Sequence, residues 1–166
     1  MSESVISLFD ESHDLPPAVS DDPFLREIEN FLYEQIPITR AMGVQVAACD
    51  ETGFVLIAPL EVNHNHLGTA FGGSLSAIAT LAGYGLLWIQ LEDRSAHIVI
   101  KNSSIRYHRP VRGAIRAICK TPDAATLTAF KTCFQKKGKA RIPLQVTIEE
   151  NDQVCVEFEG VYVAMR

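Results

Sequence analysis

The longest stretch of the sequence without a charged side chain runs from residue 62 to residue 91, between Glu61 and Glu92. From Ala70 onward it is almost wholly apolar, and about twenty such residues form a helix roughly 30 Å long. A helix that is apolar on every face lies either in a membrane or inside a protein core. Acidic residues flank the stretch, including Asp93, and no cluster of Lys or Arg marks a cytoplasmic side. The sequence therefore favours a buried helix.

Two glycines, Gly83 and Gly85, lie in the second half of this stretch, where each lowers helix stability by roughly 1 kcal/mol. Glycine at such positions is explained when another surface must approach the helix backbone closely. We therefore expect a sheet to wrap around the helix and to touch it at these two residues.

The start of the predicted helix is the first candidate site. Glycines there leave the backbone N–H groups of the first turn open to a ligand, at the positive end of the helix dipole; they are Gly68, Gly72 and Gly73. Such amides suit the oxygen of a carbonyl that becomes tetrahedral, and they suit a phosphate equally well. A glycine-rich turn without a ligand is the simpler alternative. Polar residues precede the helix, and they either belong to the same site or only cap the helix; they are His64, Asn65 and His66.

The sequence before residue 22 is polar and acidic, and we expect a loose tail over residues 1–21 and a single domain over residues 22–166. Asp22-Pro23 predicts a helix start, with Asp at the N-cap and Pro at the first helical position. This helix is expected to end before Pro37. Its apolar stripe comprises Phe24, Ile28, Phe31, Leu32 and Gln35.

Alternating apolar residues predict six strands, at residues 42–49, 54–60, 96–107, 114–120, 140–149 and 153–165. The first two and the last two are expected to form hairpins. In the strand 96–107, alternation places the even-numbered residues from Ile98 to Arg106 on one face and the odd-numbered residues from Val99 to Tyr107 on the other. A further short helix is predicted over residues 122–137, ended by Gly138. The fold class is α+β, with about six antiparallel strands curved around one long central helix.

The totals indicate one cytoplasmic domain. A chain of 166 residues, 47% hydrophobic and 21% charged, is long enough for a substantial core. Its four cysteines have no C-x-x-C spacing, which suits a reducing compartment and makes a zinc site or a disulfide scaffold unexpected. The acidic N-terminus lacks the basic start and apolar segment of a signal peptide. We expect no metal, no other cofactor and no membrane insertion.

Charge is distributed unevenly along the chain. Residues 1–93 contain fourteen acidic residues against two basic ones, whereas residues 94–141 contain twelve basic residues against Asp123 alone. A basic block in an acidic chain indicates a polyanionic partner, although a solvated strand face is the simpler alternative. Nucleic acid is not expected, because no recognition motif is present and aromatic residues are sparse in this block. The phosphates of coenzyme A or an acidic carrier protein fit better.

Two segments resemble a known family. Residues 65–73, N-H-L-G-T-A-F-G-G, resemble the N-x-x-G-x-x-H-G-G segment of hotdog-fold acyl-thioesterases of the phenylacetate-pathway type. Residues 105–113, I-R-Y-H-R-P-V-R-G, resemble the Y-x-x-P-x-x-G turn that closes the long third strand of that fold. The pattern covers roughly residues 24–166. It is most similar to thioesterase domains, some of which are fused behind bacterial GNAT-type acetyltransferase domains.

The resemblance implies roles for several residues. The amides of Gly72 and Gly73 would hold the thioester oxygen, and Asn65 would position the carbonyl or a water, with a turn or cap role as the alternative. Phe71 stands where the family has a histidine, and Thr80 stands where related enzymes place a catalytic Asp or Glu. A threonine hydroxyl can orient a water but cannot accept its proton at neutral pH. Thr80 can instead bond to a carbonyl one turn back.

The base must then come from elsewhere, and the nearest titratable side chains are His64 and His66. Each could equally be a loop residue on the surface. We assign substrate binding to Gly68 and Phe71. Contact with the pantetheine phosphates is assigned to a cluster at the turn: Arg106, His108, Arg109 and Arg112. A solvated surface turn is the alternative for this cluster. Proteins resembling this fold are dimers or larger with sites shared between subunits, so a homodimer or homotetramer is expected.

The leading functional hypothesis is hydrolysis of the thioester of acyl-CoA or acyl carrier protein. The alternative is a non-catalytic binding or regulatory module that keeps the acyl-thioester groove but lacks the base. Hydratase or dehydratase action is less favoured, because the pair of a histidine and a carboxylate that it requires is absent from the helix. Acetyl transfer is not expected, because the chain lacks an R/Q-x-x-G-x-G/A phosphate loop.

Overall fold

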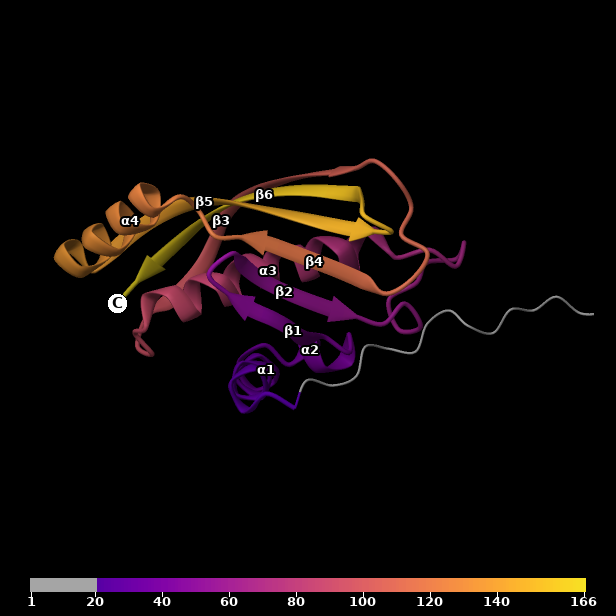
Figure 1. Ribbon diagram of the computed structural model, residues 1–166, viewed down its shortest axis with the longest axis horizontal. Coiled ribbons are helices and arrows are strands. Elements are labelled where there is room, and N and C mark those ends of the chain that lie inside the picture. Colours follow the sequence, from indigo (N-terminus) through magenta and orange to yellow (C-terminus); the bar gives the residue numbers. More distant parts are fainter. Residues whose placement is uncertain (1–20) are drawn as a thin grey trace, which may run out of the picture.

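The structure is a computed structural model that describes residues 21–166, so nearly all of the predicted tail lies outside the described residues. One six-stranded antiparallel sheet, in the order β1-β2-β4-β5-β6-β3, curves around helix α3 (Figure 1). The helices are α1 (Pro23–Gln35), α2 (Ile38–Ala41), α3 (Gly72–Leu91) and α4 (Ala124–Lys137). The strands are β1 (Gln45–Asp50), β2 (Gly53–Ala58), β3 (His97–Tyr107), β4 (Ile115–Lys120), β5 (Lys139–Glu150) and β6 (Gln153–Met165). The predicted α+β arrangement is confirmed.

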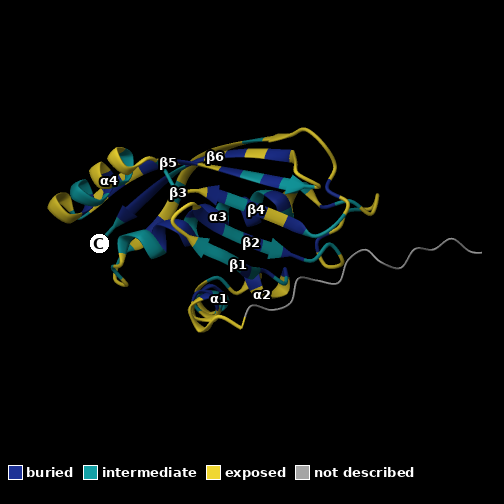
Figure 2. Cartoon of the chain, in the orientation of Figure 1, coloured by how far each residue is buried: buried dark blue, intermediate teal, exposed yellow. Residues whose placement is uncertain are grey.

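Helix α3 lies in the hollow of the sheet, where the buried residues concentrate (Figure 2). Side chains on several of its faces, among them Ile78, Ala82 and Leu87, are fully buried. Among residues 21–166, α3 is the one helix long and apolar enough to cross a membrane by length and composition. More than half of its apolar window, 56%, is buried inside the protein, as in the core helix of a wrapped sheet.

The two glycines in α3 are contact points between helix and sheet. A Cβ atom at Gly83 would lie 2.7 Å from Cε2 of Tyr162 on β6, and one at Gly85 would lie 2.8 Å from Cζ of Phe54 on β2. Real Cβ atoms essentially never come this close to another heavy atom. The predicted close approach of the sheet to the helix backbone is therefore confirmed from two sides.

Helix α1 begins as the sequence predicts, since the side chain of Asp22 accepts a hydrogen bond from the amide of Phe24 at 2.9 Å. The buried stripe is Leu25, Ile28 and Leu32, so the assignment of Phe24 to this stripe was wrong. Phe24 is 44% exposed, because the buried face follows the i, i+3, i+7 spacing that starts one residue later. Helix α2, which was not predicted, follows directly.

Helix α1 also covers the edge strand β1. The hydroxyl of Tyr33 donates to the carbonyl of Val44 at 2.6 Å, and the carboxylate of Glu29 accepts from the amide of Val46 at 3.0 Å. These side chains occupy backbone groups that another strand would otherwise pair with. The opposite edge of the sheet is β3, whose partner among the described residues is β6.

Strand β3 departs from simple alternation. Its register with β6 shifts between Ile100 and Asn102, so Lys101 is the extra residue of a β-bulge. Beyond the bulge the odd-numbered residues face α3, and Tyr107 pairs with the buried Val156. The predicted faces are therefore wrong for residues 102–107, because one inserted residue exchanges the two sides of the strand.

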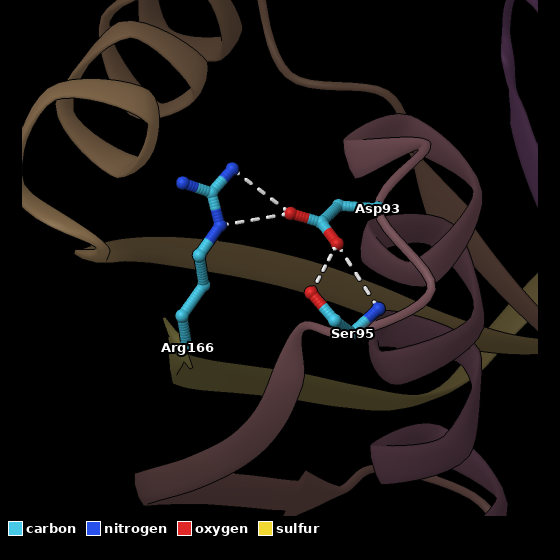
Figure 3. Close-up of polar contacts among 3 residues, drawn as sticks. All are labelled: Asp93, Ser95 and Arg166. Carbon is cyan, nitrogen blue, oxygen red and sulfur yellow. Dashed lines mark hydrogen bonds and ion pairs between the residues drawn. The ribbon is translucent and has the colours of Figure 1, made fainter.

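The end of α3 is tied to the end of the chain. Asp93 accepts hydrogen bonds from the hydroxyl and amide of Ser95 at 2.6 and 3.0 Å (Figure 3). The guanidinium of Arg166 binds the other carboxylate oxygen of Asp93 at 2.9 and 3.0 Å. These bonds, those from Ser95 foremost, hold the pKa of the Asp93 carboxyl below its usual value.

Helix α4 forms within the predicted range. Asp123 caps it by accepting from the amide of Thr126 at 2.9 Å, and Gly138 ends it at φ +66°. Phe130 and Phe134 are its buried residues, as their shared helical face predicts. The β5–β6 hairpin follows and confirms the last predicted strand pair.

Candidate functional site

A cleft of about 520 Å³ lies at the N-terminal end of α3. One wall is the start of the helix and the other is the turn that follows β3; the lining residues are Ala70, Gly72, Gly73, Leu75, Tyr107, His108, Arg109 and Pro110. The two segments that resemble thioesterase motifs therefore meet at one place, although more than thirty residues separate them in the sequence.

Two residues that line the cleft have unpaired backbone amides. Within residues 21–166, the N–H groups of Gly72 and Gly73 donate to no protein group, as expected for the first turn of a helix. Leu75 is the first residue of the helix whose amide is paired, to the carbonyl of Phe71 at 3.0 Å. The positive end of the α3 dipole adds to the partial charge of these amides, so the site favours an oxygen that carries negative charge.

Asn63 anchors the loop before the helix, a role that sequence reasoning missed. Its side chain is 2% exposed and donates to the carbonyls of Met42 and Pro59 at 2.8 and 2.7 Å. The backbone carbonyl of Asn63 accepts a hydrogen bond from the amide of Phe71 at 2.7 Å. Asn63 therefore fixes the residue that caps α3, and its burial between distant segments leaves no signal in the local sequence.

Two aromatic side chains flank the glycines. The hydroxyl of Tyr107 donates to the carbonyl of Gly72 at 3.0 Å, which joins the end of β3 to the start of α3. The ring of Phe71, 56% exposed, lies against Gly73, where an added Cβ would be 3.0 Å from Cδ1. The rings narrow the approach to the amides but leave the cleft between α3 and the turn open.

Hydrogen bonds fix the turn opposite the helix. The amide of Ala70 donates to the carbonyl of Val111 at 2.8 Å, and the amide of His108 donates to the carbonyl of Cys155 at 2.8 Å. The carboxylate of Glu150 accepts from the amides of Arg112 and Gly113 at 2.8 and 2.7 Å. The turn is therefore held both to the helix start and to the β5–β6 hairpin.

A histidine on this turn is paired with a carboxylate. Nε2 of His108 lies 2.8 Å from Oε2 of Glu157 on β6. Arg109, the next residue, donates from its guanidinium to the side-chain oxygen of Gln153. His108 is the histidine among the residues that line the cleft, but its imidazole is bonded to Glu157, whose side chain lies on the face of the sheet away from α3.

Comparisons with known proteins identify the family. Residues 25–166 match the family described as "Putative thioesterase (yiiD_Cterm)". The chain belongs to this family. Among solved structures, a protein of unknown function from Chlorobaculum tepidum TLS is 33% identical, with a TM-score of 0.80 over 89% of this chain and 98% of that one.

Two further solved structures extend the comparison. A "putative thioesterase" from Shewanella oneidensis is 28% identical, with a TM-score of 0.74 over 86% of this chain and 97% of that one. A thioesterase from Haemophilus influenzae, 15% identical, has a TM-score of 0.62 over 86% of this chain and 90% of that one, and shares the fold. The hotdog fold predicted from the sequence is confirmed by these likenesses.

The loop before α3 keeps several predicted site residues away from the cleft of this thioesterase-family chain. Asn65 uses its side chain inside the loop, accepting from the amide of Leu67 at 2.9 Å and donating to the hydroxyl of Thr69 at 3.0 Å. Gly68 lies in the same loop at φ +73°. The imidazoles of His64 and His66 are exposed, and neither histidine lines the cleft.

Thr80 lies elsewhere, about 10 Å along the helix from Gly73 at 1.5 Å per residue. Its hydroxyl donates to the carbonyl of Ser76 at 2.9 Å, one turn back. It lines a second pocket of about 700 Å³, between α1, α3 and β3, in which Tyr84 also lies. Burial raises the pKa of the Tyr84 hydroxyl, so that group stays protonated.

The basic residues of the turn separate in the structure. Arg109 and His108 line the cleft, whereas Arg106 faces away from α3, opposite Glu157 on the outer side of the sheet. Arg112 is fixed through its backbone amide and is not among the lining residues. No group of three His, Cys, Asp or Glu side chains among residues 21–166 could hold a metal ion.

Proposed function

We propose that this thioesterase-family chain hydrolyses acyl thioesters of coenzyme A or of acyl carrier protein. The observation that carries the proposal is the pair of unpaired amides, Gly72 and Gly73, at the positive end of α3 beside an open cleft. Two such donors stabilise the oxygen of a thioester carbonyl as it becomes an oxyanion. The match to a thioesterase family supports the same reaction class.

Charge near the cleft supports a polyanionic thiol carrier. Arg109 lines the cleft, and Arg106 and Arg112 lie on the same strand end and turn. Guanidinium groups bind phosphate through several donors at once. The phosphates of a pantetheine arm would therefore lie along this turn while the thioester carbonyl points to the α3 amides.

The open edge of the sheet supports a homo-oligomer as the working form. Strand β3, eleven residues long, is an edge strand of the sheet, and among the described residues it pairs with β6 alone. Such an edge is a template for pairing with a second copy.

The cysteines support a reducing cytoplasm as the location of the protein, because four of them are unpaired among the described residues: Cys49, Cys119, Cys133 and Cys155.

The test removes one amide without removing the helix. Proline is favoured at the first helical position, and Phe71 already has the extended ψ of 132° that a following proline requires. Gly72→Pro therefore deletes one N–H, and we expect kcat/KM for acyl-CoA, measured by release of the free thiol, to fall about 10²- to 10³-fold.

Gly72→Ala is the matched control, because it adds a Cβ at the same place and keeps the N–H. The added Cβ would lie 3.4 Å from the Tyr107 hydroxyl, an ordinary contact. The ratio of the two variants reports the amide alone. Equal rates for Gly72→Pro and Gly72→Ala would contradict the proposed role of this amide.

A second candidate, a binding module without catalysis, is favoured by one observation. Helix α3 carries no Asp or Glu between Gly72 and Leu91, and Thr80 is bonded to its own helix. A carboxylate base on the helix is therefore missing. Saturable binding of acyl-CoA without thiol release, across substrates of different chain length, would select this candidate.

A further inference from the structure

We propose that a second copy of this chain places the loop before α3, with its exposed Leu67, in the groove between α1, α3 and β3 of the first copy. The inference rests on the homo-oligomer proposed above and names the two surfaces that meet. A two-fold contact is reciprocal, so each copy supplies one loop and receives the other. The cleft at the start of each α3 is then completed by the other copy.

The groove is a gap in the cover of α3. Helix α1 lies along the β1 edge of the sheet, and β3 is the opposite edge. Between them a strip of α3 remains only partly buried and lines a space of about 700 Å³; its residues are Ala77, Thr80 and Tyr84. The hydroxyl of Thr80 donates to Ser76 in its own helix, and that of Tyr162 donates to Thr80. These two hydroxyls are thus paired with the helix backbone, and the groove suits an apolar partner.

The loop before α3 is held in one shape by its own hydrogen bonds. The side chain of Asn65 accepts from the amide of Leu67 at 2.9 Å, and the amide of Asn65 donates to the carbonyl of Thr69 at 2.7 Å. The amide of Gly68 donates to the carbonyl of Asn65 at 3.0 Å. The loop therefore presents the side chain of Leu67, 74% exposed, from a fixed backbone, so its docking costs little conformational entropy.

Exposed apolar side chains gather on the two proposed surfaces. Eight large hydrophobic residues are exposed among residues 21–166, and four of them lie on this loop, at the α3 N-cap or at the adjoining end of β3: Val62, Leu67, Phe71 and Tyr107. A fifth, Ile38, lines the groove. Exposed apolar residues that cluster in this way mark sites of protein contact.

Two-fold symmetry brings these surfaces together. The bond from Tyr107 to Gly72 places the end of β3 at the start of α3, whereas His97, at the start of β3, lines the groove. When a two-fold axis continues the sheet through β3 and keeps both α3 helices on one face, the paired strands run antiparallel. An axis near the middle of β3 then sets the end of one β3 beside the start of the other. The loop of each copy therefore reaches the groove of its partner.

Charge is complementary between the two surfaces. The loop, residues 61–71, has one charged side chain, the exposed Glu61. The guanidinium of Arg94 lines the groove, lies 3.5 Å from the ring centroid of Trp88, and reaches the carboxylate of Glu27 only at 3.8 Å. An acidic loop therefore approaches a groove with a guanidinium at its side, which favours this pairing of surfaces.

Docking affects the cleft, because the loop ends at the residue that caps α3. Phe71 is 56% exposed, and its ring lies against Gly73 beside the unpaired amides. A second copy packed against this ring holds it in place and excludes water from the amides, which strengthens their interaction with an oxyanion. Assembly and turnover are therefore coupled.

The first test is Leu67→Asp, followed by sedimentation velocity over a range of protein concentrations. We expect the dissociation constant of the dimer to rise about 10²-fold, because a carboxylate enters an apolar groove twice in each dimer. The value of kcat/KM for acyl-CoA should fall at concentrations where the variant is a single chain. Because Leu67 is exposed, its far-UV circular dichroism spectrum should match that of the wild type. Ala129→Asp is the control, since it adds a carboxylate to an exposed position on α4, which packs on β5.

The second test asks whether loop and groove touch. Ile38→Lys alters the groove alone, and Leu67→Glu alters the loop alone; we expect each to weaken association. The chain that carries both substitutions places opposite charges at the contact, and its association should recover at least about 10-fold relative to either single variant. A double variant as weak as the single ones would overturn the contact.

Three other results would overturn the inference: a wild type that sediments as a single chain at all concentrations, a Leu67→Asp protein that associates like the wild type, and a single-chain Leu67→Asp protein with the kcat/KM of the wild type. Sedimentation reads assembly independently of turnover. A wild type that associates through these surfaces but releases no thiol would refute the proposed hydrolysis and support the contact.

Discussion

A close contact between α3 and the sheet, at Gly83, gives the sharpest prediction of stability. In Gly83→Ala the new methyl group collides with the ring and hydroxyl of Tyr162, a side chain that is 1% exposed. The ring borders the 700 Å³ pocket on one side but is otherwise packed in the core, so a shift of the ring disturbs its neighbours. Its hydroxyl also donates to the carbonyl of Thr80 at 2.8 Å, and this bond is lost when the ring shifts.

The magnitude follows from three opposing effects. Alanine stabilises a helix interior by about 1 kcal/mol relative to glycine. Overpacking a filled core destabilises by about 1–3 kcal/mol, and an unpaired buried polar group by about 1–3 kcal/mol. With central values, the free energy of unfolding of Gly83→Ala is about 3 kcal/mol below that of the wild type.

Urea denaturation followed by far-UV circular dichroism measures this difference, provided that the m-value is unchanged. Gly72→Ala, in the same helix, makes only an ordinary 3.4 Å contact with Tyr107, and we expect a change within about 0.5 kcal/mol. A Gly83→Ala protein as stable as the wild type, or more stable, would refute the claim that the sheet touches the helix backbone at this residue.

Three further predictions concern other buried or paired groups. Asn63→Ala removes two hydrogen bonds and leaves two carbonyls unpaired, so we expect a loss of about 2–4 kcal/mol in denaturant titrations; an unchanged midpoint would contradict the anchoring role. The lowered pKa of Asp93 means that its contacts with Ser95 and Arg166 stabilise the fold above the ordinary pKa of an aspartate and are lost as the pH falls through the lowered value. The melting temperature of Asp93→Asn should therefore fall below that of the wild type at neutral pH and converge with it in acid, and a constant difference would count against this linkage. Burial raises the pKa of the Cys119 thiol to about 12, so this thiol should react with a disulfide reagent only on unfolding, and rapid native-state labelling at Cys119 would show that it is accessible.

Much of the fold is encoded in local patterns. The uncharged stretch predicts α3, and the chemistry of Asp22-Pro23 and Gly138 predicts the ends of two other helices. The glycines at 83 and 85 even indicate where the sheet touches the helix. These features are readable because each depends on the spacing or backbone preference of neighbouring residues.

The site was harder to predict, because its parts meet through the register of the sheet. No Gly or Pro marks the bulge at Lys101, yet this residue decides that Tyr107 faces α3 and that Arg106 does not. The contact of His108 with Glu157 joins residues 49 positions apart. Thr80 was assigned by its spacing from Gly73, whereas helix geometry carries its side chain to another pocket.

The side chains of Glu29 and Tyr33 limit how copies of this protein could join. They fill hydrogen-bonding positions at the β1 end of the sheet, while β3 at the far end stays open among residues 21–166. A sheet that can add a strand at only one edge pairs with one neighbouring sheet, and no open edge then remains for a further copy. Two chains joined in this way would make a finished twelve-stranded layer, and fibre-like growth by strand addition would stop there.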